Sequence, residues 1–420
     1  MDLILRNARF ADGSVHDIGI VDDRIVEISH TPIAHSGRDK ILDIGHRLTL
    51  PAFVNGQLHA CKSFYRRNLV HMPEHVKRLP RFEAARSVKE AYTEEDVFAR
   101  VDETMRLAIL NGICAIRLFA DVDEHSGLVA LCTLLRIRER YKHIMTVQVV
   151  AFPQDGVLGS QTQSLMRTAL DLGADVVGGI PWIEPTNALQ REHTQLCFDL
   201  AQQYGRPVHM VCDDAVKTNL RTLEMIVEQT MAKSMQGRVC ATQCAALAAY
   251  DDAYAADLIA RVYEAQISIV CNSHVGLIAT DLPMDGARPR EPMPRAITRV
   301  RALLDSEVTV CCAQDDIDNW FYPFGRNDPM EWAQFMAHTG QFAWEGEIDR
   351  VLPMITTNPA RAIGLPNYGL AVGCQANLVV MDSTDWHAAV QFQPAKRFVI
   401  LRGRLAAQSI RTEELENGII

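Results

Sequence analysis

The stretch LTLPAFVNGQLHACKSF, residues 48–64, carries the pattern on which the fold prediction rests. An apolar run leads into the polar residues Gln57 and His59, and Cys61 and Lys62 follow directly. A near-continuous apolar run that ends in polar residues is typical of a strand buried on both faces of a parallel sheet, with functional groups at its C-terminal end. A fold prediction follows if the pattern repeats along the chain.

Seven further apolar runs follow, most of them about 30 residues apart, and helical periodicity fills the segments between them. Two of these segments, residues 95–112 and 193–205, close at glycine, as helices commonly do. Eight β-α units predict an α/β fold, a parallel (β/α)8 TIM-type barrel, with its function at the C-terminal strand ends. The seven runs are residues 113–121, 144–152, 174–181, 206–214, 238–244, 267–274 and 308–316.

Both ends of the chain have short strand patterns instead. The N-terminal patterns are residues 3–10 and 18–29, in which Asp22-Asp23 is suited to a hairpin turn. Similar patterns return in the C-terminal segment. We therefore predict a small β-sandwich domain made by both chain ends, residues 1–50 plus 366–420, beside a barrel of residues 51–365.

The composition favours a small-molecule substrate. The 420 residues are 48% hydrophobic and 22% charged, with a net charge of −10 and no long basic block. These features argue against nucleic acid or a membrane surface as a partner. No apolar stretch reaches the roughly 20 residues of a membrane span, and no signal peptide is evident, so we expect a cytoplasmic protein. The 11 cysteines show no C-x-x-C pair and fit small core residues in a reducing compartment.

Several motifs give the chain a resemblance to a known family. They include AFPQ (151–154), VCDD (211–214), the block from 297 to 325, and TTNPARAIGL (356–365). With residues 48–64, they resemble amidohydrolase-superfamily enzymes of the branch that holds cytosine deaminase and N-isopropylammelide isopropyl amidohydrolase. The resemblance covers nearly the whole chain and implies a barrel with a small β domain, and homo-oligomers.

The resemblance also implies a divalent metal ion at the strand ends, but most of its ligands are replaced here. The H-x-H pair has become Gln57-x-His59, and the histidine of strand five falls on Val211. Only His59 and Asp315 remain of the four ligands. A catalytic zinc site needs three or more protein donors, so we predict a degenerate, metal-independent site with no cofactor. Recruitment of an ion through Cys61, His59 and Asp315 is an alternative.

Other family positions also differ. The catalytic histidine of strand six is Gln243, the proton-shuttling glutamate is shortened to Asp214, and the histidine before Asp315 is Gln314. Glutamine keeps its hydrogen-bonding capacity but cannot titrate. Three glutamines at histidine positions, with Gln57 among them, therefore indicate a polar pocket that is still in use.

We predict that Asp315, His59 and Asp214 carry the proton chemistry. Asp315 is the general base, its pKa raised by burial and by Asp214, and His59 is its partner. Cys61 is a possible nucleophile, although inert packing is the alternative. His209 and His274 are held in reserve.

Seven residues are predicted to bind the substrate. A buried glutamine offers a donor and an acceptor on one planar group, which suits a lactam or amidine edge. The resemblance assigns this role to Gln154, and a lysine at the barrel mouth suits a carboxylate or carbonyl group. The predicted substrate-binding residues are Gln154, Gln57, Gln243, Gln314, Asp316, Trp320 and Lys62.

We therefore predict a metal-independent, cytosine-deaminase-like amidohydrolase homologue. It would act at a C–N or carbonyl centre of a small nitrogen-rich heterocycle, by hydrolysis of an activated bond, ring opening or closing, or proton transfer. The alternatives are a noncatalytic ligand-binding or scaffolding barrel and an ordinary metal-dependent deaminase with atypical ligands. The proline-rich loop at 281–294 is either a lid or a solvated connection.

Overall fold

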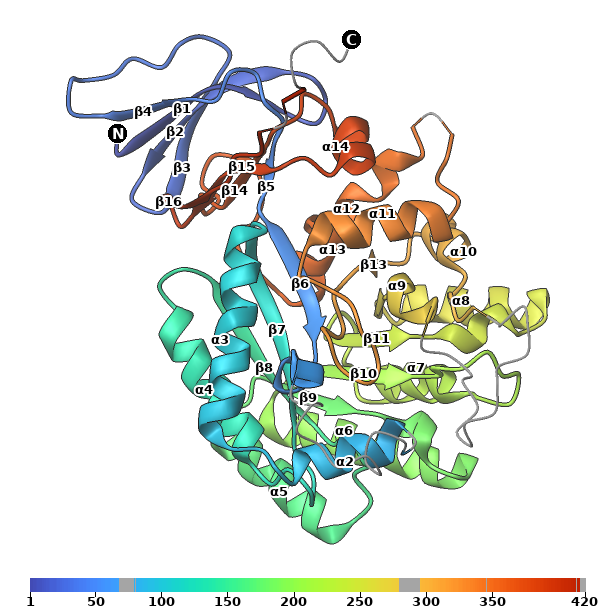
Figure 1. The fold of residues 1–420 in the computed structure, drawn as a ribbon. Helices are drawn as coiled ribbons and strands as arrows, with labels where there is room; N and C mark the ends of the chain where they lie inside the picture. Colours follow the sequence, from blue (N-terminus) through green and yellow to red (C-terminus); the bar gives the residue numbers. More distant parts are fainter. Residues whose placement is uncertain (68–78, 80, 279–294, 345, 413, 416–420) are drawn as a thin grey trace. The chain divides into compact units, whose positions relative to one another are not determined.

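The computed structural model describes residues 1–67, 79, 81–278, 295–344, 346–412 and 414–415 (Figure 1). It divides into two compact units. Unit 1 consists of Met1–Phe53, Ala108–Cys114 and Pro366–Ile420, and unit 2 of Val54–Leu107 and Ala115–Leu365. The 281–294 loop lies outside the described residues.

The barrel sheet has eight strands in sequence order. Every neighbouring pair described is parallel, for example β10 with β11 and β12 with β13. A parallel bridge between Leu58 and Asp315 joins the first strand to the segment after the last one and nearly closes the sheet. The predicted (β/α)8 barrel is thus confirmed. The strands are β6 (Phe53–Leu58), β7 (Ile113–Asp121), β8 (Thr146–Phe152), β9 (Val176–Gly179), β10 (Val208–Cys212), β11 (Val239–Gln243), β12 (Ser268–Val270) and β13 (Val310–Cys311).

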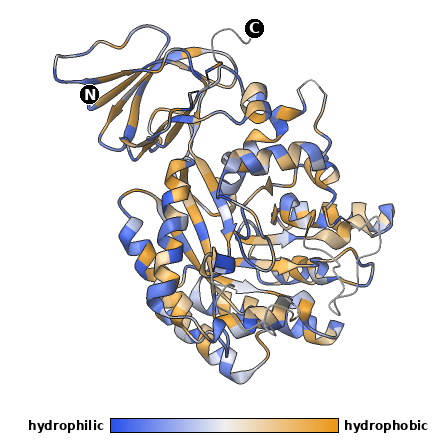
Figure 2. Ribbon diagram, viewed as in Figure 1, coloured by the Kyte–Doolittle hydropathy of each residue, from blue (hydrophilic) through white to orange (hydrophobic). Residues whose placement is uncertain are grey.

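The barrel strands are apolar because both of their faces are covered. All nine residues of β7 are buried, as are all residues of β6, β9, β10 and β11. Figure 2 shows the strands largely in hydrophobic colours, whereas the outer helices alternate. Gly178 in β9 allows close packing, since a Cβ there would lie 2.8 Å from the Ala151 carbonyl oxygen.

Helices cover the outside of the barrel strands (Figure 1). Asp251 caps α8 by accepting from the Tyr254 amide, and Thr186 caps α6, which ends at Gly205 in a left-handed conformation. The helices of unit 2 are α2 (Arg81–Lys89), α3 (Glu94–Leu110, whose last turn belongs to unit 1), α4 (Val129–Tyr141), α5 (Ser160–Asp171), α6 (Asn187–Tyr204), α7 (Thr222–Ala232), α8 (Asp252–Glu264), α9 (Ser273–Gly276), α10 (Val300–Asp305), α11 (Pro329–Thr339), α12 (Leu352–Ile355) and α13 (Thr357–Ala362). Short 3-10 helices are η1 (Ala60–Lys62), η3 (Pro181–Ile183), η4 (Ala245–Ala248) and η5 (Ile348–Arg350).

Unit 1 contains two four-stranded sheets, in the orders β3-β2-β1-β4 and β16-β15-β14-β5. Leu5 and Ile20 of the first sheet share a hydrophobic core with Leu378 and Ile400 of the second, so the sheets pack as a sandwich. The predicted hairpin turns at Asp22, which has a φ of 52°. The elements are β1 (Leu3–Arg9), β2 (Val15–Val21), β3 (Arg24–Ser29), β4 (Lys40–Asp43), β5 (Thr49–Pro51), β14 (Leu378–Met381), β15 (Lys396–Leu401), β16 (Arg404–Gln408) and α14 (Trp386–Phe392).

The first apolar run differs from the prediction because it contains two strands. β5 pairs with β14 in unit 1, and only β6 joins the barrel sheet. Ala52 separates the two strands and donates its amide to the Asn377 carbonyl. Among the described residues, no helix is long and apolar enough to cross a membrane.

Candidate functional site

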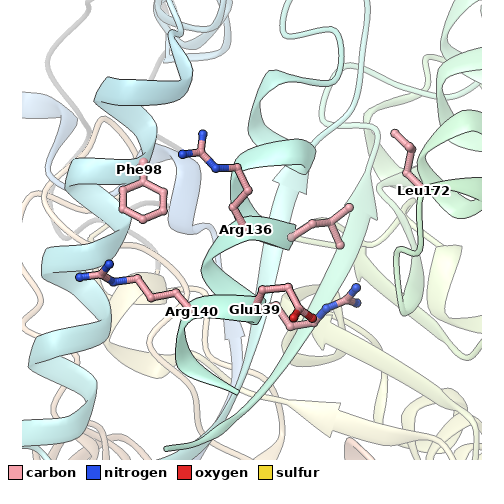
Figure 3. Close-up of a pocket in the computed structure, with 7 residues that line it drawn as sticks. Phe98, Arg136, Glu139, Arg140 and Leu172 are labelled. Carbon is pink, nitrogen blue, oxygen red and sulfur yellow. The ribbon is translucent and has the colours of Figure 1, made fainter. Parts of the chain in front are cut away.

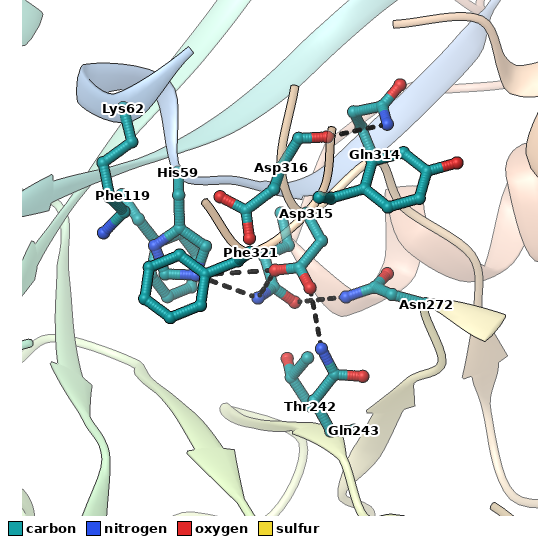
Figure 4. Close-up of polar contacts among 12 residues, drawn as sticks. His59, Lys62, Phe119, Thr242, Gln243, Asn272, Gln314, Asp315, Asp316 and Phe321 are labelled. Carbon is teal, nitrogen blue, oxygen red and sulfur yellow. Dashed lines mark hydrogen bonds and ion pairs between the residues drawn. The ribbon is translucent and has the colours of Figure 1, made fainter. Parts of the chain in front are cut away.

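Asp315 lies at the centre of a polar cluster at the C-terminal strand ends (Figure 4). Gln57 of β6 donates from Nε2 to Asp315 Oδ1 at 2.8 Å, and Gln243 of β11 donates from Nε2 to Oδ2 at 2.7 Å. His59 Nε2 lies 3.5 Å from Oδ1. Residues 57, 243 and 315 are far apart in sequence, but the barrel brings their side chains onto one carboxyl group.

Asn272 fixes the orientation of the Gln57 amide. Its Nδ2 donates to Gln57 Oε1 at 3.1 Å, which leaves the Gln57 nitrogen to face Asp315. The same nitrogen lies 3.5 Å from His59 Nε2. The Gln57 amide nitrogen therefore lies beside both His59 and Asp315, the two residues that the resemblance implies as remaining ligands.

The backbone around this cluster has a conformation that L-residues rarely adopt. The φ angles of Asp315 and Gln243 are 64° and 70°. Two hydrogen bonds hold Asp315 there: its amide donates to the Gln57 carbonyl at 3.0 Å, and its carbonyl accepts from the His59 amide at 2.7 Å. Strained residues of this kind persist where surrounding contacts determine them, and they gather at functional sites.

Burial shifts the pKa values of Asp315 and His59 in opposite directions. Burial, then the charges of Asp316 and Asp214, raise the pKa of Asp315 well above its usual range. Burial, then the charges of Lys62 and His209, lower the pKa of His59 well below its usual range. His59 is therefore a neutral imidazole, and it lies beside the Asp315 carboxyl group, which keeps its proton more readily than usual. His59 Nδ1 is buried and has no hydrogen-bond partner among the described residues.

A second polar cluster surrounds Lys62 in η1. The ammonium donates to Asp121 Oδ1 at 2.8 Å and to Gln154 Oε1 at 2.7 Å. The Lys62 side chain is 5% exposed and the Asp121 side chain 0%, so this ion pair is screened little by water. The rings of Phe152 and Phe321 lie 5.9 and 6.0 Å from the ammonium nitrogen.

Asp316 carries an acceptor close to both clusters. Burial raises its pKa to about 6, while Lys62 and a hydrogen bond from Asn319 act in the opposite direction. Asn319 donates to Oδ1 at 2.5 Å. The pKa of Asp316 is thus closer to neutral pH than that of an ordinary carboxyl group, which suits a group that exchanges protons or binds a ring N–H.

Gln314 does not join these clusters. Its Oε1 accepts from the Asn327 amide at 2.8 Å and from Trp332 Nε1 at 3.0 Å, and its Nε2 donates to the Asp316 carbonyl. Gly325 permits this close approach, since a Cβ there would lie 2.6 Å from Gln314 Nε2. The Gln314 amide is therefore used inside the protein, and its predicted substrate contact is unsupported.

Cys61 lies beyond the first barrel strand, because β6 ends at Leu58 and the chain turns into η1. Its thiol points to the Phe119 carbonyl, 3.7 Å away. Burial and the charge of Asp121 raise the pKa of Cys61 to about 12. The thiol is therefore protonated at neutral pH, which argues against the role of nucleophile.

The remaining predicted residues lie around this core. Asp214 is half-buried and acts on Asp315 through its charge. Its neighbour Asp213 is structural, since it accepts from the amides of Thr222 and Leu223 at the start of α7. Trp320 is half-buried and packs on Tyr65 with ring centroids 5.5 Å apart.

His209 and His274, held in reserve, are both packed inside the protein. His209 Nε2 lies 2.7 Å from Thr242 Oγ1, and its Nδ1 lies 3.1 Å from the buried Arg117. His274 Nε2 donates to the Gln314 carbonyl at 2.9 Å. Both are buried supports of the strand ends.

Sequence reasoning did not identify Asp121 as a site residue. Asp121 closes the second apolar run, and its position as the last residue of β7 is the same signal that identified Asp315. Its Oδ2 is buried and lacks a hydrogen-bond partner among the described residues. Asn272, in the run of residues 267–274, also belongs to the site, since it orients Gln57.

The residues present do not fit the divalent ion that the resemblance implies. Val211 has no donor atom, and Gln57 supplies a carboxamide whose nitrogen points at Asp315. An ion between His59 and Asp315 would have to displace that N–H group. Within the described part of the chain, no three His, Cys, Asp or Glu side chains are grouped so that they could hold a metal ion.

A separate hollow of about 490 Å³ lies on the outer surface between α3, α4 and the end of α5 (Figure 3). It is lined by Phe98, Leu135, Arg136, Arg138, Glu139, Arg140 and Leu172. Each arginine is already paired: Arg136 with Glu94, Arg138 with Asp175, and Arg140 with Asp102. The hollow is thus a salt-bridged helix surface remote from the strand ends.

A barrel whose strand ends combine an acid, a neutral imidazole and oriented amides defines the class: a hydrolase of the (β/α)8-barrel type that acts on C–N bonds. The chain belongs to the amidohydrolase family, whose model matches residues 72–407.

Comparisons with known proteins place it near heterocycle-processing members. N-isopropylammelide isopropyl amidohydrolase of Pseudomonas sp. (strain ADP) is 28% identical over 418 residues, 96% of each chain. The structure of 5-methylcytosine deaminase from Klebsiella pneumoniae, liganded with 5-fluorocytosine, is 28% identical with a TM-score of 0.89, covering 98% of this chain and 99% of that one. N-isopropylammelide isopropylaminohydrolase from Burkholderia multivorans is 26% identical, with a TM-score of 0.83 and coverages of 97% and 98%.

Proposed function

We propose that the protein is a metal-independent hydrolase that acts at a C–N or carbonyl centre of a small nitrogen-rich heterocycle, with His59 and Asp315 as its proton carriers. The observation that carries the proposal is the position of Gln57. Its Nε2 donates to Asp315 Oδ1 at 2.8 Å and lies 3.5 Å from His59 Nε2, so an N–H donor faces the space that an ion bound to both residues would need.

The two proton carriers have complementary states. His59 is neutral at pH 7 because burial lowers its pKa, so it can accept a proton from an attacking water. Asp315 keeps a proton more readily than an ordinary carboxyl group because its pKa is raised, so it can donate to a leaving nitrogen or a carbonyl oxygen, and we propose it as the general acid in place of the general-base role predicted from the sequence. Gln57 and Gln243 hold the Asp315 carboxyl group in place through their amides.

Acid–base groups without a metal ion limit which bonds the protein can hydrolyse. General acid–base groups accelerate a reaction by about 10² to 10⁴-fold. Hydrolysis of an unactivated amine substituent needs more than that, so the reacting bond is an activated one. Ring opening or closing of a ureide, or hydrolysis of an activated amide or imine, meets this limit.

A heterocyclic substrate is supported by the relatives and by the site. The names of the relatives refer to ammelide and methylcytosine, both planar nitrogen heterocycles. Around Lys62, the rings of Phe152 and Phe321 lie beside amide and carboxyl groups. Aromatic faces with a few oriented polar groups suit a planar polar ring.

The experiment that tests the proposal combines metal analysis with a substrate screen. Protein purified without chelators is analysed by plasma mass spectrometry, and hydrolysis of pyrimidines, triazines and cyclic ureides is measured with and without a chelator. We expect far less than one ion per chain and turnover that the chelator does not change. About one ion per chain, with activity lost on chelation, would contradict metal independence. Tight binding without turnover of any compound would instead favour a ligand-binding barrel.

A further inference from the structure

The contact between Lys62 and Gln154 determines which end of the Gln154 amide faces outward. Lys62 has three N–H donors and no acceptor. Its ammonium lies 2.7 Å from Gln154 Oε1, so the amide oxygen is held by a charge-assisted hydrogen bond. A reversed amide would point its NH2 group at an ammonium. The free end of Gln154 is therefore the NH2 group, a donor.

Lys62 cannot turn away from this position easily. Its second hydrogen bond goes to Asp121 Oδ1, 2.8 Å away, and both side chains are almost wholly buried. A buried ion pair is costly to break because each partner would be left as an unpaired charge. The charge of Asp121 also raises the pKa of Lys62 against the effect of burial, so the ammonium stays charged. Gln154 consequently faces a permanent donor.

Gln154 stands where a barrel binds its ligand. It lies two residues beyond β8, Asp121 is the last residue of β7, and Lys62 lies in η1, which follows β6. Among the described residues, Lys62 is the one hydrogen-bond partner of the Gln154 side chain. The Gln154 NH2 group is thus left for a ligand, and Asp316 nearby supplies an acceptor for a ring N–H.

We infer that Lys62 is a positioning residue that sets specificity. It holds the Gln154 amide with its NH2 group toward the ligand, so the site takes heterocycles with a carbonyl oxygen at that edge and rejects those with an amino group there. The inference rests on the proposed function in one respect, the small heterocyclic ligand. An amino group at this edge would place two donors against each other, and a site built for one hydrogen-bond pattern rejects the opposite pattern strongly.

Two probes differ in what every edge presents to the Gln154 NH2 group. Cyanuric acid presents protruding carbonyl oxygens beside N–H groups, whereas melamine presents amino groups, or ring nitrogens that are each flanked by two amino groups and so place donors beside the Gln154 donor. Binding of both to the full-length protein is measured by calorimetry. We expect cyanuric acid to bind at least about tenfold more tightly, a difference of about 1.4 kcal/mol. Equal affinities, or no binding of either probe, would overturn the inference.

Two variants test the role of Lys62 directly. Lys62→Met combined with Asp121→Asn removes both charges and frees the Gln154 amide to rotate, so melamine affinity should rise and the preference should fall toward one. Gln154→Glu keeps the Lys62 contact but presents an acceptor, so the preference should reverse in favour of melamine. An unchanged preference in Gln154→Glu would overturn the inference even if the double variant fails to fold.

A matched control removes a different buried lysine. Lys89 is 1% exposed and forms ion pairs with Asp123 and Asp155, without contact to Gln154. Lys89→Met should lower the thermal stability and keep the preference for cyanuric acid. Because binding is measured without turnover, the outcomes separate: a preference without any hydrolysis contradicts the proposed function alone, and hydrolysis without a preference contradicts this inference alone.

Discussion

The side-chain nitrogen of Gln57 lies 2.8 Å from Asp315 Oδ1 and donates a hydrogen bond to it. This single contact ties the first barrel strand to the segment after the last one, beside the backbone hydrogen bond between the same two residues. It also satisfies a carboxyl oxygen that is almost fully buried. A neutral amide thus does part of the work of a cation at this point, because its N–H dipole faces the carboxyl group.

The resemblance implies histidines at positions 57 and 211, and restoring both should restore metal binding. Gln57→His combined with Val211→His would add two imidazoles to His59 and Asp315, which gives four N or O donors, the number that a zinc site needs. We expect zinc content to rise from far below one to about one ion per chain, measured by plasma mass spectrometry. Gln57→His alone is the control and should bind zinc weakly. If the double variant also lacks zinc, the strand ends no longer have the geometry of a metal site.

Substitution of Asp315 and substitution of Asp213 should separate an effect on turnover from an effect on stability. Asp315→Asn should lower turnover by about 10² to 10⁴-fold but lower the thermal unfolding temperature only slightly. It removes a carboxyl group that burial and the charges of Asp316 and Asp214 disfavour, which offsets the NH2 group that it turns toward one of the two glutamine donors. Asp213→Asn should do the opposite. Its carboxylate accepts from the Thr222 and Leu223 amides, and weakening these contacts should cost about 1–3 kcal/mol of stability. Similar behaviour of the two variants would contradict this division.

Gln314 and Gln243 looked equivalent in the sequence, but their substitution should affect stability and turnover differently. Gln314→Ala leaves the Asn327 amide and the Trp332 indole N–H buried without an acceptor, and we expect a loss of about 2–4 kcal/mol in denaturant unfolding. Gln243→Ala removes a donor from Asp315 only, so its effect should fall on turnover and less on stability. A larger stability loss in Gln243→Ala than in Gln314→Ala would contradict the assigned roles.

Cysteine labelling should distinguish the buried thiols from the accessible ones. Burial raises the pKa of Cys61 to about 12, so it should resist iodoacetamide at pH 8 in the folded protein. Cys132 and Cys374, which are half-buried, should react first. Peptide mass spectrometry of the labelled protein reads out each site. Rapid labelling of Cys61, or loss of activity in Cys61→Ser with the fold intact, would restore the nucleophile hypothesis.

The barrel could be predicted because its signal is distributed over the whole chain. Each apolar run between helical segments became a strand, and the strand-end rule brought Gln57, His59, Gln243 and Asp315 into one cluster. This rule depends on topology alone, since parallel strands of a barrel end on the same face. Neither side-chain rotamers nor exact strand lengths were needed for it.

Orientation beyond the strand ends could not be predicted in the same way. β6 stops at Leu58 and β13 at Cys311, so the alternation of side chains no longer holds at Cys61 or Gln314. Asp315 adopts a φ of 64°, and that turn decides which of residues 314–316 faces the barrel interior. The Gln314 amide instead accepts hydrogen bonds from Asn327 and Trp332. These partners come from a later loop and helix, and no local sequence pattern predicts their contact with Gln314.

The stability of the protein should fall in acid partly because of His274. Burial lowers the pKa of His274 to about 4, from an ordinary value of 6.5. Between these values the unfolded chain binds a proton that the folded protein excludes, so stability rises with pH across the window and is lost as pH falls from 6.5 to 4. At about 1.4 kcal/mol per pKa unit, the shift of this one group corresponds to about 3.5 kcal/mol. Urea unfolding of wild type and His274→Gln at pH 7 and pH 4.5 checks this. The variant keeps a polar group of similar size that cannot titrate, so it should lose less stability between the two pH values. Equal losses in both proteins would show that His274 does not contribute to acid sensitivity.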